Sequence, residues 1–125
     1  MSKAKSIDEV SWEVGRIRTH CYLIERGVRA AASEVVHKSA AVEVREAIVR
    51  ARLSHTEQDY GGNHIEFTIY KHDHVGMILS LLQEHFLVIP EYLRHYLCGK
   101  LYGYSEEEIG RYMCEVILQD ESEFN

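Results

Sequence analysis

The sequence predicts an α+β fold in which a small antiparallel β-hairpin is packed by a long N-terminal helix and several C-terminal helices. Three observations lead to this prediction. Apolar residues recur every three or four positions between residues 10 and 35, apolar and polar residues alternate in two stretches between 49 and 70, and helical patterns return after residue 72. We expect a single domain over residues 1–125, with flexible ends at 1–7 and 120–125.

The composition excludes several classes of protein. The chain is 46% apolar and 27% charged, which is typical of a globular domain. Acids outnumber bases 20 to 14, which disfavours binding to duplex nucleic acid because that affinity comes from contacts between basic side chains and phosphates. No apolar run approaches the roughly 20 residues of a membrane span. The three scattered cysteines form no disulfide framework, so we expect a cytoplasmic protein.

The first helix is expected to run from about Asp8 to about His37. Its apolar positions are spaced alternately by four and three residues, and they are Val10, Val14, Ile17, Cys21, Ile24, Val28, Ala31 and Val35. Gly15 and Gly27 interrupt this helix, which indicates a kink or a close approach of another backbone or a ligand. Since the stripe is longer than a lone hairpin can cover, we expect a symmetric homo-oligomer.

The remaining elements follow from shorter patterns. A short helix is expected after Ser39. The hairpin strands are expected at 49–54 and 64–70, with a long loop at 55–63 that contains Gly61-Gly62-Asn63. Three helices complete the chain. The first is capped by Asp73, the second carries Pro90 in its first turn and ends at Gly103, and the third begins with a capping box at 105–108.

A segment of small residues and arginines is the first candidate binding site. It contains Arg26, Gly27, Arg29 and Ala30. Small residues allow a phosphate to approach the backbone, and arginine supplies fork-shaped donors for it. The alternative is a tight contact between helices with Arg–Glu pairs at its rim. Arg50 and Arg52, expected on the open face of the hairpin, would join this site or the second candidate site.

The C-terminal half supplies the second candidate site. Its aromatic and basic residues include Phe86, Tyr92, Arg94 and Arg111, interleaved with Tyr96, Tyr102, Tyr104, Tyr112 and His95. A nucleobase stacks on tyrosine rings and arginine holds phosphates. The alternative is that these tyrosines belong to the core or to an interface.

Catalytic and metal sites are not expected. His72 and His74 are two residues apart, which suits one face of a strand but not of a helix, and no known metal motif accompanies them. The cysteines at 21 and 114 lie on apolar helical stripes, where cysteine usually acts as a small buried side chain. We therefore predict no enzyme activity, no catalytic residue, no metal and no cofactor. Residues 90–117 superficially resemble a helix-turn-helix, but three glutamates begin the second helix, which favours an αα-hairpin.

Four segments together resemble a known family. They are SWEVGRI at 11–17, IERGVRAAA at 24–32, FTIYK at 67–71 and GKLYGYS at 99–105. They resemble the small phage anti-Thoeris proteins of the signal-sequestering ("sponge") type. The resemblance implies an oligomeric, non-catalytic anti-defence protein that binds cyclic ADP-ribose-type messengers. Some such proteins also hold cyclic oligonucleotides at a second site.

The resemblance also assigns roles to residues. It places phosphate contacts at Arg26, Gly27, Arg29 and Ala30, and it assigns the ADP-ribose ligand to the C-terminal aromatic and arginine residues. The rival hypothesis is a protein-binding inhibitor or adaptor that acts through an acidic surface, and a DNA-binding regulator is a third. The arrangement of Arg26 and Arg29 discriminates among them, since a ligand site requires that they converge on a cavity.

Overall fold

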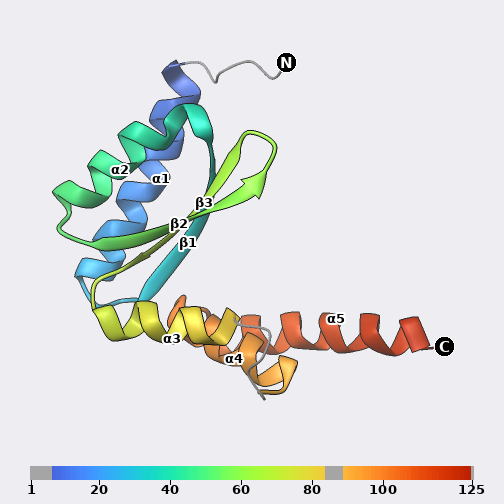
Figure 1. The fold of residues 1–125 in the computed structure, drawn as a ribbon. Coiled ribbons are helices and arrows are strands. Elements are labelled where there is room, and N and C mark those ends of the chain that lie inside the picture. Colours follow the sequence, from blue (N-terminus) through green and yellow to red (C-terminus); the bar gives the residue numbers. More distant parts are fainter. Residues whose placement is uncertain (1–6, 84–88, 125) are drawn as a thin grey trace.

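The structure is a computed structural model that describes residues 7–83 and 89–124. Its elements are, in chain order, α1 (Ile7–Glu25), β1 (Ala31–His37), the 3-10 turn η1 (Lys38–Ala40), α2 (Ala41–Arg50), β2 (Ser54–Gly61), β3 (His64–Tyr70), α3 (Asp73–Gln83), α4 (Glu91–Leu101) and α5 (Glu106–Phe124). Figure 1 shows α1 and α2 side by side on one face of the sheet, with α3 and α4 gathered at one end of it. The α+β class is confirmed.

The N-terminal helix is shorter than the sequence predicted. It ends at Glu25 because Gly27 adopts φ +75, and the Val28 N–H returns to the Leu23 carbonyl at 2.9 Å. A left-handed glycine just past the last turn is a common way to end a helix. The predicted continuation to His37 is therefore wrong, and residues 31–37 form strand β1 instead.

The sheet has three antiparallel strands in the order β1-β3-β2. Ala31 of β1 and Ser54 of β2 both pair with Tyr70 of β3. The second strand of the predicted hairpin is confirmed as β3, but the first lies at 54–61, within the predicted loop, rather than at 49–54. Residues 41–50 are helical, so the short helix after Ser39 is confirmed. Arg50 ends this helix and Arg52 lies in the following turn, so neither lies on an open hairpin face as predicted.

The core lies between α1, α2 and the sheet. Its cluster includes the apolar stripe of α1 (Val14, Ile17, Cys21, Ile24), Val44 and Ile48 of α2, and Phe67 and Ile69 of β3. Burial of each large apolar side chain stabilises the fold by roughly 1.5–3 kcal/mol. Because the chain's own sheet and α2 cover this stripe, the stripe no longer argues for an oligomer. Self-association stays a prediction.

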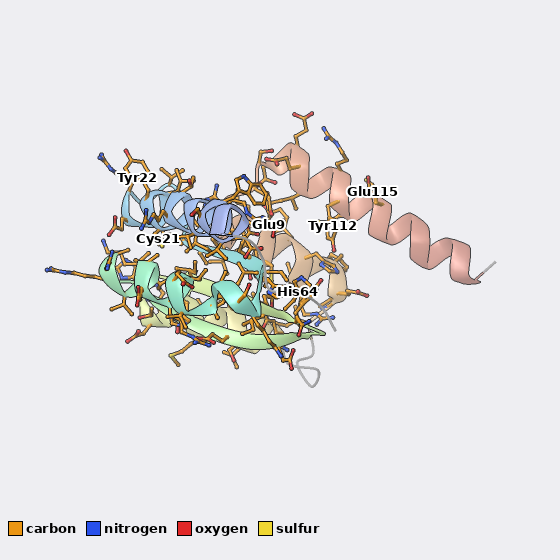
Figure 2. The ribbon with its side chains drawn as sticks, turned by 90° about the horizontal axis from the view of Figure 1, so that it is seen from above. Glu9, Cys21, Tyr22, His64, Tyr112 and Glu115 are labelled. Carbon is orange, nitrogen blue, oxygen red and sulfur yellow. The ribbon has the colours of Figure 1, made fainter. Side chains whose placement is uncertain are left out.

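The C-terminal helices follow the predicted order. Pro90 is the N-cap of α4 rather than a first-turn residue. The capping box of α5 is confirmed, since Glu108 N donates to Ser105 Oγ and Ser105 N donates to Glu108 Oε1, both at 3.1 Å. Figures 1 and 2 agree that α5 extends well past the other elements. The predicted flexible ends are not tested. Residues 1–6 and 125 lie outside the described residues, and the backbone remains helical to Phe124.

Within residues 7–83 and 89–124, the helices are too short or too polar for any of them to cross a bilayer.

Candidate functional site

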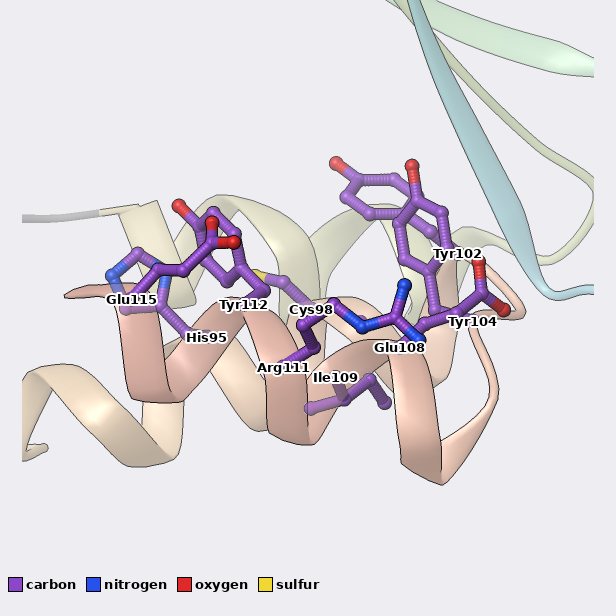
Figure 3. Close-up of a pocket in the computed structure, with 10 residues that line it drawn as sticks. His95, Cys98, Tyr102, Tyr104, Glu108, Ile109, Arg111, Tyr112 and Glu115 are labelled. Carbon is purple, nitrogen blue, oxygen red and sulfur yellow. The ribbon is translucent and has the colours of Figure 1, made fainter. Parts of the chain in front are cut away.

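A hollow of about 550 Å³ opens along the α4–α5 hairpin. Both helices and the turn between them supply its lining, which consists of His95, Cys98, Gly99, Tyr102, Tyr104, Glu108, Ile109, Arg111, Tyr112 and Glu115. Figure 3 shows Tyr102 and Tyr104 at one end, His95, Tyr112 and Glu115 at the other, and Arg111 between them. The hollow therefore presents aromatic rings at both ends.

A close contact between the two helices forms the floor of the hollow. A Cβ atom added to Gly99 of α4 would lie 2.8 Å from Cγ1 of Ile109, and Ile109 of α5 is buried. The absence of a side chain at Gly99 thus lets α5 approach closely. The larger side chains on either side of this contact form the wall of the hollow.

The turn after α4 places two tyrosines on the same side of the hairpin. Gly103 adopts φ +82, a conformation that other residues rarely adopt. The Tyr102 N–H donates to the Cys98 carbonyl and the Tyr104 N–H donates to the Gly99 carbonyl, both at 2.9 Å. These bonds fix the backbone on both sides of Gly103 and hold the two rings at one end of the hollow.

Three titratable groups that line the hollow have shifted pKa values. Burial raises the pKa of the Cys98 thiol, so this thiol stays protonated at neutral pH. Burial is also the main reason that the pKa of Tyr102 rises to about 12. By contrast, hydrogen bonds from the backbone and side chain of Ser105 lower the pKa of Glu108 and keep it ionised.

The opposite end of the hollow combines a histidine and a tyrosine, and Arg111 lies between the two ends. The His95 ring packs edge-on against Tyr112 with 5.3 Å between centroids, and its Nε2 lies 3.4 Å from Glu91 Oε1. Arg111 Nη2 donates to Glu107 Oε1 at 3.3 Å, but both side chains are largely exposed. Such a surface pair contributes little, so Arg111 can exchange this partner for an anion on a ligand.

Among the described residues, Arg111 and the interleaved His95, Tyr102, Tyr104 and Tyr112 of the second candidate site line the hollow. Tyr92 lies on α4 with an exposed side chain. Arg94 lies on the same helix, and its Nε is buried without a hydrogen-bond partner. Phe86 lies outside the described residues. Arg50 and Arg52 are exposed at the end of α2 and do not contribute to the lining.

The N-terminal candidate residues separate into two pairs. Arg26 and Gly27 are exposed, and the Arg26 guanidinium lies 4.9 Å over the Tyr22 ring. Arg29 Nη1 donates to His20 Nδ1 at 3.2 Å, and the Ala30 N–H donates to the Leu101 carbonyl at 3.1 Å. None of the four lines the hollow, so a role for them in binding phosphate stays a prediction.

Sequence reasoning did not single out Cys98, Glu108 and Glu115 as site residues. A signal was present, because residues 95, 98, 99 and 102 recur on one side of α4, as do 108, 111, 112 and 115 on α5. Two helices joined by a short turn bring such stripes together.

No metal centre is evident in the part of the chain that the structure describes, where no group of three or more His, Cys, Asp or Glu residues is arranged to hold an ion. His72 and His74 stack with 5.5 Å between ring centroids.

No protein-family model matches this chain, and no curated protein matches it.

Proposed function

We propose that this protein binds a phosphate-bearing nucleotide messenger in the hollow of the α4–α5 hairpin and holds it without changing it. The observation that carries the proposal is the grouping of Tyr102, Tyr104, Tyr112 and Arg111 around a single hollow. Protein sites for small molecules usually have volumes of about 300–1,000 Å³, and a hollow of about 550 Å³ falls in that range.

The lining suits the two parts of a nucleotide. Stacking of a base on an aromatic ring contributes about 1–3 kcal/mol, and Tyr102 and Tyr104 offer rings at one end of the hollow. A charge-assisted hydrogen bond from arginine to phosphate contributes about 1.5–3 kcal/mol, and Arg111 lines the same hollow as the rings. Ionised Glu108 accepts hydrogen bonds from the N–H groups of a base or from ribose hydroxyls.

Binding without chemical change follows from the states of the groups in the hollow. A thiol attacks only as the thiolate, and burial keeps the Cys98 thiol protonated. A carboxylate with a lowered pKa is a weak base, and this applies to Glu108. These groups favour retention of the ligand over its cleavage.

The proposed biological role is sequestration of a cyclic ADP-ribose-type signal, as the resemblance to the anti-Thoeris sponge proteins implies. A protein of this kind lowers the free concentration of a messenger and so withholds it from the immune effector that needs it. Cyclic oligonucleotides, proposed for a second site, would lie at Arg26 and Gly27, away from the hollow.

Calorimetry with a panel of ADP-ribose, cyclic ADP-ribose isomers and cyclic oligonucleotides tests this proposal. We expect Tyr104→Ala and Arg111→Gln each to weaken binding by roughly tenfold to a hundredfold. Tyr60→Ala is the matched control, because Tyr60 is as exposed as a binding tyrosine but lies on β2. Chromatography should recover the bound nucleotide intact. Absence of binding to every member of the panel would refute the proposal, and recovery of a cleaved product would refute retention.

A second candidate function, a protein-binding adaptor, is favoured by the distribution of charge. Helix α5 carries seven acids and one base, whereas residues 1–105 carry thirteen of each, so the net charge of −6 resides in α5. The helix also extends past the rest of the molecule (Figure 2). Joint replacement of Asp120, Glu121 and Glu123 by their amides should then reduce binding to polylysine, used as a basic probe, and leave nucleotide binding unchanged.

A further inference from the structure

We propose that Arg29 is a positioning residue for the tyrosine end of the hollow and that His20 makes the hollow sensitive to pH. This inference rests on the proposed function, because it concerns the regulation of the same site. Arg29 and His20 lie outside the hollow, and both act through the turn that carries Tyr102 and Tyr104.

The first step is the contact between Arg29 and that turn. A Cβ atom added to Gly103 would lie 2.8 Å from Cβ of Arg29. Gly103 stands between Tyr102 and Tyr104, which both line the hollow. One residue further along, the Ala30 N–H donates to the Leu101 carbonyl at 3.1 Å. The segment that enters β1 is thus pressed against the turn that holds the two rings.

A hydrogen bond to His20 holds the Arg29 side chain in place. Its Nη1 donates to His20 Nδ1 at 3.2 Å, while its Nε is buried without a hydrogen-bond partner. A guanidinium only donates hydrogen bonds, so Nδ1 of His20 must present a lone pair. This hydrogen bond therefore requires the neutral imidazole that carries its proton on Nε2.

The other side of the histidine faces a carboxylate. His20 Nε2 lies 3.5 Å from Glu34 Oε1, and both side chains are about four-fifths buried. Arg16 Nη1 lies 2.9 Å from the same oxygen. The charged groups that face His20 are thus Arg16 from its own helix, Glu34 from β1 and Arg29 from the segment before β1.

A second proton on His20 changes which neighbouring side chain its ring can bind. An imidazolium cannot accept a hydrogen bond at Nδ1, and it would face the Arg29 guanidinium, another cation, at hydrogen-bond distance. Its attraction to Glu34 increases at the same time. Protonation therefore breaks the hydrogen bond from Arg29 to Nδ1, strengthens the existing contact of Nε2 with Glu34, and releases the Arg29 guanidinium beside the turn.

Protonation of His20 sets the direction in which ligand affinity changes with pH. Histidine is the side chain that ordinarily gains a proton between pH 8 and pH 5. The hollow is ordered when His20 is neutral, so ligand affinity should fall as the pH falls. Loss of one hydrogen bond from a charged group corresponds to a weakening of about tenfold or more. By linkage, ligand binding should release a proton from His20.

The main experiment measures the dissociation constant of ADP-ribose, the probe, at pH 7.5 and pH 5.5. The wild-type protein should lose about tenfold in affinity at the lower pH. His20→Gln should lose much less, since a glutamine accepts from Arg29 at either pH. Arg29→Lys should bind weakly at both values, and Arg18→Ala, the control on an exposed arginine of α1, should behave as wild type. Because a second histidine, His95, lines the hollow itself, the same pair of measurements is made in a His95→Gln background.

A measurement without ligand separates this inference from the proposed function. Amide hydrogen exchange at Ala30 and Tyr104 reports the contact with the turn and the turn itself. At pH 5.5 both amides should exchange faster in wild type than in His20→Gln, and at pH 7.5 they should exchange equally. Faster exchange without any ADP-ribose binding would support the role of Arg29 and His20 and refute the ligand. Equal exchange at pH 5.5, or a pH dependence of affinity that persists in His20→Gln, would overturn the inference.

Discussion

The body formed by α1, α2 and the sheet differs sharply from the arm formed by α3, α4 and α5. In the body, Ile17, Phe67 and Ile69 are completely buried. In the described part of the arm, eight large apolar or aromatic side chains are exposed, and these are Met77, Ile78, Leu81, Tyr92, Leu93, Leu97, Tyr104 and Tyr112. The larger body exposes six, which are Trp12, Tyr22, Val28, Val42, Val49 and Tyr60. The largest fully buried side chains thus lie in the body, whereas the smaller arm exposes more of its large apolar side chains.

The largest expected effect is on the body. Phe67→Ala removes a fully buried ring from the centre of the core and should cost about 3–5 kcal/mol of unfolding free energy. Urea denaturation checks this value. Leu97→Ala in the arm is the matched control, because Leu97 is 36% exposed and should cost far less. Equal losses for the two variants would remove the distinction between body and arm.

The reactivity of the three free cysteines offers a second test of the difference between the body and the arm. Burial raises the pKa of Cys21, in the body, to about 11 from an ordinary 9.0, which reduces its thiolate fraction about a hundredfold. Cys114 of the arm is exposed and Cys98 is half-buried. Iodoacetamide should therefore label Cys114 first, Cys98 next and Cys21 only after unfolding, as followed by peptide mass spectrometry. Bound nucleotide should protect Cys98 but leave Cys114 unprotected.

The floor of the hollow tests how tightly the arm is packed. Gly99→Ala places a methyl group 2.8 Å from Ile109, and overpacking of this kind costs about 1–3 kcal/mol. The gain in helix propensity, about 1 kcal/mol, offsets part of this cost. We expect a small net loss of stability and a clear loss of ligand affinity. The double variant Gly99→Ala/Ile109→Val should recover part of the affinity, because the smaller valine leaves room for the added methyl group. A lack of recovery would show that the contact between residues 99 and 109 does not shape the hollow.

The smallest expected effect concerns an ion pair of the body. Arg45 donates two hydrogen bonds of 2.7 Å to Glu57. These bonds are the main reason that the pKa of Glu57 falls to about 2 from 4.5. Its folded pKa is lowered, so the pair stabilises the protein fully above about pH 4.5 and loses this effect as the pH falls towards 2.

The exposure of both side chains, 44% for Arg45 and 29% for Glu57, limits the contribution of the pair to about 0.5 kcal/mol. Denaturation of Glu57→Gln should show that loss at pH 7 and almost none near pH 2. A loss that is the same at both pH values would mean that packing, rather than charge, supports β2.

The sequence predicted the elements in which the spacing of apolar residues matches the spacing of buried residues. The stripe of α1 was visible because Val14, Ile17 and Cys21 all face the core. Strand β2 was missed because its residues are mostly exposed and show no alternation of apolar and polar positions. The end of α1 was missed because a left-handed Gly27 leaves no mark on the spacing of apolar residues.

The site was harder to predict than the fold. The tyrosines and Arg111 were recognised as candidates by type, but their grouping depends on the close approach of Gly99 and Ile109. The contact of Arg29 with Gly103 joins segments far apart in the sequence, and no local pattern announces it. Arg29 was therefore assigned to phosphate binding, whereas the structure places its guanidinium against His20.

The concentration of negative charge in α5 gives the whole molecule a large electric dipole moment. Residues 1–105 carry no net charge, so the molecule will turn in the field of a basic partner until the acidic helix α5 approaches first. Such steering raises association rates by tenfold or more at low ionic strength and fades as salt screens it. The arm would thus make the first contact with a basic partner, whereas an anionic nucleotide would be directed away from the far end of α5 and would reach the hollow from the side of the body.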